Sequence, residues 1–147
     1  MSSASKSTVI DDSVFYRAYD YDHYNCFHFA CEMIGRIQAG PAPDPEAIIA
    51  AVREKPGRSL KAGVFGEADE AERTGKSGRG GGFRRVGQPA EGSLCLFQNP
   101  SGEETHTGVF YQGRVLHIQE NGVKFQPLHI VLLQFRRVSF YDYLDHN

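Results

Sequence analysis

The sequence predicts an α+β fold in which N-terminal helices pack on a C-terminal antiparallel sheet. The two segments whose apolar residues recur at helical spacing, residues 26–37 and 44–55, both lie near the start of the chain. The segments with the alternation or apolar composition of strands follow residue 92. At 147 residues the chain is most simply one domain, and it is long enough to bury a core.

Composition excludes several classes of protein. The net charge of -2 implies no general affinity for nucleic acids or membranes, and no apolar run has the length of a membrane span. The polar start at residues 1–7 lacks the hydrophobic segment of a secretory signal, so we expect a protein made in the cytoplasm. Cys26, Cys31 and Cys95 are an odd number of cysteines, which argues against a disulfide framework.

The N-terminal part is expected to contain a flexible tail at residues 1–12, followed by a single domain over residues 13–147. Ordered structure should begin in the tyrosine-rich segment 14–21. A helix should follow, with Asn25 as its N-cap and an end near Gly40. The residues of its apolar stripe are Cys26, Phe29, Ala30, Met33, Ile34 and Ile37.

Cys26 falls in the first turn of this helix. The unpaired N–H groups and the positive end of the helix dipole favour a thiolate there, so the position predicts a lowered thiol pKa and a nucleophile. The alternative is a small buried apolar residue, the usual role of a free cysteine.

A second helix is predicted over Asp44–Lys55, with Asp44 as N-cap and Pro45 in the first turn. The next segment, at about 57–88, is rich in glycine and arginine and predicts an exposed loop that is mobile over residues 66–87. This loop could also contact an anionic partner or act as a lid or docking segment.

The remainder of the chain predicts strands joined in part by a tight hairpin. The expected strands are residues 93–97, 105–111, 114–119, 123–126 and 136–144, and residues 128–134 are ambiguous between strand and helix. Gln112 and Gly113 form a two-residue turn, which sets Tyr111 opposite Arg114 and His106 opposite Gln119. One face of this hairpin carries His106, Gly108, Phe110, Val115, His117 and Gln119.

This register brings two histidines to one face. Gly108 has no side chain, so it leaves space for the ring of His117 to lean toward His106. His117, or alternatively the amide of Gln119, could then fix the tautomer of His106 so that its other nitrogen faces a thiol. A zinc site of His106 with His23 and His28 is a weaker interpretation, because the usual ligand spacings are not present.

Several of these segments together resemble the NlpC-type cell-wall cysteine peptidases, a compact papain-like family. Asn25-Cys26 before an apolar helix is similar to the family's nucleophile segment, and residues 89–97 are similar to its turn into the first core strand. His106-Thr107-Gly108-Val109-Phe110 resembles its histidine strand, and His117 falls at its third polar residue. The resemblance covers residues 15–127 without the middle loop. The family usually has Asp-Cys-Ser-Gly at the cysteine, and its upstream Tyr-x-x-Gly-Gly has no copy here.

The resemblance implies a papain-like domain with Cys26 as nucleophile, His106 as general base and acid, and His117 as the orienting residue. Tyr24 and Gln119 are the candidate substrate-binding residues, although Tyr16, Tyr19 and Tyr21 are equally placed beside the helix. The implied substrate is the peptide stem of peptidoglycan, cut at an amide bond without a cofactor. Because members of the family occur in bacteriophage tails, tail proteins are the implied partners.

Two alternatives remain open at this point. The segment from Asn25 to Phe29 is also similar to the cysteine motif of the lecithin retinol acyltransferase-like branch, which suggests an acyltransferase or thioesterase on the same residues. In that branch the histidine strands precede the cysteine, whereas here Cys26 comes first, as in the peptidases. The other alternative is a non-enzymatic structural part of a larger assembly.

Overall fold

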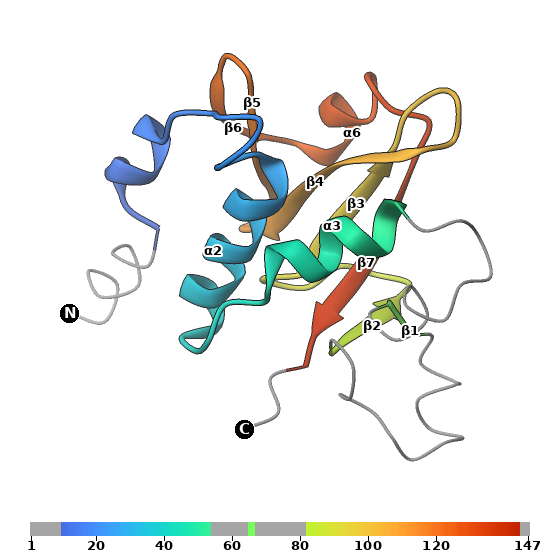
Figure 1. The fold of residues 1–147 in the computed structure, drawn as a ribbon, viewed down its shortest axis with the longest axis horizontal. Helices are drawn as coiled ribbons and strands as arrows, with labels where there is room; N and C mark the ends of the chain where they lie inside the picture. Colours follow the sequence, from blue (N-terminus) through green and yellow to red (C-terminus); the bar gives the residue numbers. More distant parts are fainter. Residues whose placement is uncertain (1–9, 54–64, 67–81, 145–147) are drawn as a thin grey trace.

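The structure is a computed structural model that describes residues 10–53, 65–66 and 82–144 (Figure 1). Nearly all of the expected flexible tail lies outside these ranges, as does the glycine-rich stretch at residues 67–81. Ordered structure is already present at Ile10, which packs against the core, so it starts a few residues before the predicted domain boundary.

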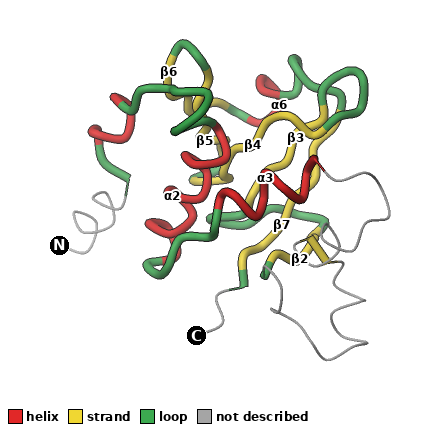
Figure 2. Tube along the Cα trace, in the orientation of Figure 1, coloured by secondary structure: helices red, strands yellow, loops and turns green. Residues whose placement is uncertain are grey.

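The described chain is α+β, as predicted, with its main helices before most of its strands (Figure 2). The helical elements are the 3₁₀ helix η1 (Asp12–Tyr16) and the α-helices α2 (Cys26–Gln38), α3 (Pro45–Arg53) and α6 (Leu128–Val131). The strands are β1 (Phe65–Gly66), β2 (Phe83–Val86), β3 (Leu94–Gln98), β4 (Glu104–Tyr111), β5 (Arg114–Gln119), β6 (Gly122–Gln126) and β7 (Arg137–Tyr143).

These strands form one sheet in the order β1-β2-β7-β3-β4-β5-β6. Every neighbouring pair from β2 to β6 is antiparallel, and the two-residue β1 pairs parallel with β2. β7, the last strand of the chain, lies between β2 and β3, so the C-terminal segment is inserted inside the sheet.

Helix α2 begins at Cys26, as the sequence predicted. The side chain of Asn25 accepts from the backbone N–H groups of Phe27 and His28, while His28 Nδ1 accepts from the Asn25 N–H, which completes a capping box. The helix ends when Ala39 adopts a left-handed conformation (φ 56°), close to the predicted end at Gly40.

The sheet buries two separate sets of apolar side chains because successive residues of a strand point to opposite faces. One set packs with α2 and α3 and includes Leu94, Leu96, Val109, Leu116 and Ile118. The other set lies on the opposite face, where α6 and the segment after it provide cover, and includes Cys95, Phe97, Val115 and Val131. The expectation that the helices pack on the sheet is therefore confirmed for one face.

The β4–β5 hairpin turns at Gln112 and Gly113, as predicted, and pairs Tyr111 with Arg114. Its ladder ends with Val109 opposite Leu116, so the expected pairing of His106 with Gln119 is wrong. Beyond that point β5 continues to pair with β6, and β4 continues to pair with β3. The N-terminal half of β4 and the C-terminal half of β5 therefore share no backbone ladder.

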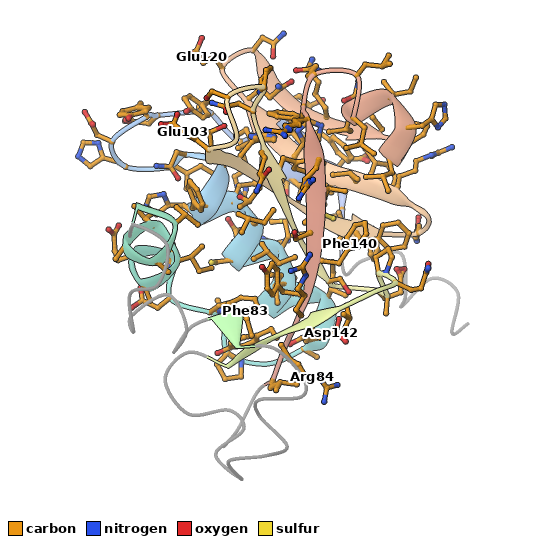
Figure 3. All side chains as sticks on the ribbon, turned by 90° about the vertical axis from the view of Figure 1, so that its right-hand side faces the viewer. Phe83, Arg84, Glu103, Glu120, Phe140 and Asp142 are labelled. Atoms are coloured by element: carbon orange, nitrogen blue, oxygen red, sulfur yellow. The ribbon has the colours of Figure 1, made fainter. Side chains whose placement is uncertain are left out.

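The described residues of the predicted loop at about 57–88 include two strands, β1 (Phe65–Gly66) and β2. Phe83–Val86 was expected to be part of the exposed loop, but it is strand β2, because Phe83 is buried and the segment pairs with β7. Arg84 lies opposite Asp142 in that pairing (Figure 3). The ambiguous segment 128–134 begins as helix α6. None of the helices in the described ranges has the length and apolar character that crossing a bilayer requires.

Candidate functional site

His106 and His117 form a buried pair. Nε2 of His106 lies 2.8 Å from Nδ1 of His117, and the two rings meet edge to face at 78°. His117 is fully buried and His106 is 8% exposed. The predicted approach of the two rings is therefore present, although these residues are not opposite each other in a backbone ladder.

Aromatic rings enclose His106. The ring of Phe135, which precedes β7, stacks on it with an angle of 3° between the ring planes, and Phe97 on β3 packs against it at 36°. This burial, reinforced by the neighbouring His117, lowers the pKa of His106 to about 3. Burial also lowers the pKa of His117, and this effect outweighs the hydrogen bond with Gln126, which raises the pKa. Both rings are consequently neutral near pH 7.

His117 has a second hydrogen-bond partner, which the sequence analysis missed. Its Nε2 lies 3.0 Å from Oε1 of Gln126 on β6. In the β5–β6 ladder Val115 is opposite Gln126 and His117 is opposite Lys124, so Gln126 is a diagonal neighbour on the same face. A register for the turn between β5 and β6 would have placed Gln126 beside His117.

Cys26 lies at the first turn of α2, against the start of β4. Its Sγ is 4.0 Å from the carbonyl oxygen of Thr105, and the hydroxyl of Thr107 donates to the carbonyl oxygen of Cys26 at 3.0 Å. Burial raises the pKa of the Cys26 thiol, although Thr107 and the helix N–H groups lower it in part. The predicted lowered pKa is therefore wrong, because desolvation of the thiolate outweighs the helix terminus.

The Cys26 thiol lies beside Thr105, the residue before His106, and no hydrogen bond joins the thiol to the imidazole among the described residues. Thr107 faces α2, so the adjacent His106 projects from the other side of β4. Nδ1 of His106 has no hydrogen-bond partner among the described residues. Every fully buried side-chain nitrogen or oxygen in those residues has a partner, so Nδ1 must be in contact with solvent.

The tyrosines before α2 separate into different environments. The hydroxyl of Tyr24 donates to Glu32 on α2, which also pairs with Arg17, and the partly buried Tyr24 ring packs against the core. Burial and the Glu32 hydrogen bond raise the pKa of Tyr24 to about 12. Tyr19 instead lies close enough to Cys26 for the thiol to contribute to its raised pKa, after burial as the main cause.

The remaining candidate residues lie apart from the histidine pair. His28 caps α2, and its Nε2 lies 3.2 Å from Glu46 Oε2 on α3. His23 lies beside Asp20 in an exposed turn. Gln119 donates to Oε1 of Gln134 at 3.1 Å, so its amide is engaged outside the pair. These positions do not gather His23, His28 and His106 at one point.

No protein-family model matches this chain, and neither a curated protein nor a solved structure matches it. The case for a function therefore depends on the geometry around Cys26, His106 and His117.

Proposed function

We propose that this protein is a papain-like cysteine hydrolase of the NlpC type, which cleaves an amide bond in the peptide stem of peptidoglycan. The observation that carries the proposal is the hydrogen bond between Nε2 of His106 and Nδ1 of His117. It occupies one nitrogen of His106 and leaves Nδ1 accessible, at a strand whose start contacts the Cys26 thiol. A nucleophile, a base and an orienting group are the parts that acyl transfer needs.

The pKa values define the resting state of this site. A raised pKa at Cys26 and a lowered pKa at His106 leave a neutral thiol and a neutral imidazole, rather than a thiolate and an imidazolium. His106 must therefore act as a general base during attack. As Sγ bonds to the amide carbonyl carbon, the thiol proton passes to Nδ1 of His106 around the start of β4, where Sγ lies beside Thr105.

The first turn of α2 offers a donor for the oxyanion that forms. The N–H groups of Phe27 and His28 already donate to Asn25 Oδ1, whereas the N–H of Cys26 has no partner within the described chain other than its own thiol. This single N–H is placed to stabilise the negative oxygen of the tetrahedral intermediate. Collapse of the intermediate breaks the C–N bond, and His106 returns its proton to the departing amine.

Water then completes the reaction. His106 Nδ1 removes a proton from a water molecule that attacks the thioester, and the same proton returns to the Cys26 sulfur as the acid is released. His117 takes no part in forming or breaking these bonds. Its role is to hold the His106 ring in the orientation and tautomer that the base requires.

The choice of substrate comes from the motif resemblance. The residues from His106 to Phe110 and the position of His117 resemble segments of cell-wall peptidases, and this supports a stem peptide as the substrate. The same resemblance supports incorporation in a bacteriophage tail. A tail component would reach the wall through the particle that carries it.

The structure weakens one argument for an acyltransferase. Asn25 and His28, which the chain shares with the acyltransferase-like motif, form the reciprocal cap of α2. The cap that starts the helix at Cys26 therefore accounts for both residues, and their presence gives no information about the acyl donor. Acyltransferase or thioesterase activity is therefore one of the outcomes that the test below distinguishes.

The test is to incubate the purified protein with isolated peptidoglycan and to identify the released fragments by mass spectrometry. We expect new amine and carboxyl ends in the stem peptide with the wild type, none with Cys26→Ala, and an unchanged pattern with His129→Ala, which alters an exposed histidine on α6. Parallel reactions contain a short acyl thioester. Hydrolysis of the thioester without any cut in peptidoglycan would replace the peptidase by a thioesterase.

A further inference from the structure

Gln126 is the last of three side chains that are joined by hydrogen bonds on the α6 side of the sheet, and these bonds form a hydrogen-bond chain. Its Oε1 is 3.0 Å from Nε2 of His117, whose Nδ1 is 2.8 Å from Nε2 of His106. The three residues come from β6, β5 and β4 in turn. Each contact joins neighbouring strands, and the series runs from the buried His106 to the partly buried Gln126 on the edge strand β6.

The amide oxygen gives this chain a direction. A carbonyl oxygen can only accept, so Nε2 of His117 must carry the hydrogen of that bond. A neutral imidazole has one N–H, so Nδ1 of His117 must be the acceptor toward His106. Nε2 of His106 must then carry its hydrogen, and Nδ1 of His106 is left with a lone pair.

This direction holds only while both rings are neutral, and their burial keeps them neutral. A protonated His117 would have hydrogens on both nitrogens and would donate through Nδ1, which would move the hydrogen of His106 from Nε2 to Nδ1. The lowered pKa values of both histidines keep this state unpopulated near pH 7.

We propose that Gln126 is a positioning residue that sets the tautomers of His117 and His106, and thereby leaves Nδ1 of His106 free to accept a proton. The catalytic use of that nitrogen rests on the function proposed above, but the tautomers themselves do not. Without the amide oxygen, the two neutral rings can form the same hydrogen bond in either direction. The reversed direction places the hydrogen on Nδ1 of His106, where it cannot accept the thiol proton.

Three variants at position 126 distinguish this role from simple packing. Gln126→Met keeps the length of the side chain but removes the hydrogen bond. Gln126→Glu can only accept, so it retains the direction of the chain, while its charge should raise the pKa of His117. Gln119→Met is the matched control, because Gln119 is a strand glutamine whose amide bonds to Gln134 instead.

The experiment reads the tautomers by nitrogen-15 NMR of the full-length protein, labelled at histidine and free of substrate, at pH 7. We expect His117 and His106 each to be protonated at Nε2 in the wild type and in Gln119→Met. In Gln126→Met both rings should become mixtures of tautomers. In Gln126→Glu the wild-type tautomers should hold at high pH and be lost on acidification, at a pH above that of the wild type.

A wild-type spectrum with His117 protonated at Nδ1 overturns the inference, and so does a Gln126→Met spectrum that retains the wild-type tautomers. Because no substrate is present, these results stand whether or not the protein cleaves an amide. If it does, Gln126→Met should lower kcat about tenfold or more with little change in KM. Gln126→Glu should restore activity at high pH, which a loss of packing would not produce.

Discussion

Gly108 lies directly against His117, at the point where the β4–β5 ladder stops. A Cβ atom at position 108 would be 3.1 Å from Cβ of His117 and 2.7 Å from Cγ1 of Val115. The Cβ of His117 and the side chain of Val115 therefore approach β4 so closely that position 108 has no room for a side chain. This contact connects the fold of the hairpin to the hydrogen bond between the two histidines.

Gly108→Ala should consequently destabilise the protein and separate the histidine pair. The added methyl group would meet atoms of Val115 and His117, and overpacking of this kind costs roughly 1–3 kcal/mol of unfolding free energy. Denaturant unfolding measures this change. Gly87→Ala is the matched control, since a Cβ there has no atom within 4 Å, and equal stability of the two variants would contradict the steric argument.

The histidine pair should also make stability depend on pH. An unfolded histidine takes up a proton as the pH falls through about 6.5, whereas the folded protein keeps His106 neutral down to a pKa of about 3. The unfolded state thus binds more protons between these values. The stabilising effect is complete above about pH 6.5 and is lost as the pH falls toward 3.

The comparison is between the wild type and His106→Gln, which can still donate to His117 but does not titrate. From pH 7 to pH 4.5, the wild type should lose about 2–3 kcal/mol more of its unfolding free energy than the variant, at about 1.4 kcal/mol per pKa unit. His129→Gln, at an exposed position of α6, should behave as the wild type. Parallel pH curves for the wild type and His106→Gln would show that burial of His106 has no such effect.

Local signals were sufficient for the first helix and the hairpin. Asn25 before an apolar stripe specified the start of α2, because a cap depends only on residues within one turn. Gln112-Gly113 between two alternating segments specified the turn and the near pairs for the same reason. The approach of His106 to His117 was predicted from the shared face of the hairpin, although the predicted register holds only as far as Val109 and Leu116.

Pairing between strands that are far apart in the chain leaves no local signal in the sequence. The strand at Phe83–Val86 has a glycine- and arginine-rich flank, and it is identified only by its pairing with β7, more than fifty residues later in the chain. Gln126 was missed because its partner is a diagonal neighbour on another strand. The direction of the Cys26 pKa shift was wrong because the helix terminus is visible in the sequence, whereas burial of the thiol is a property of the assembled core.

The environment of Cys26 predicts a slow, strongly pH-dependent thiol. Burial raises its pKa, so the rate of alkylation by iodoacetamide should still be rising above the free-thiol value of about 8.5. Thr107→Val should slow the reaction further, since the Thr107 side chain is among the groups that lower the pKa of this thiol. Intact-mass measurement over a range of pH gives both results. An inflection below 8.5 would show that Cys26 has the lowered pKa of an activated thiol, and His106 would then not be needed as a general base for the attack.

The last prediction separates the two residues that could orient His106. His117→Ala should lower kcat roughly 10- to 100-fold with little change in KM, because an orienting residue acts mainly in the transition state. Gln119→Ala should have little effect, since the described pairing of Gln119 is with Gln134 and it is not opposite His106 in the hairpin. Both variants are assayed on isolated peptidoglycan, with Cys26→Ala as the inactive reference. If Gln119→Ala were the more damaging change, Gln119 would have to reach the site in the substrate complex, and the assignment of His117 as the orienting residue would fail.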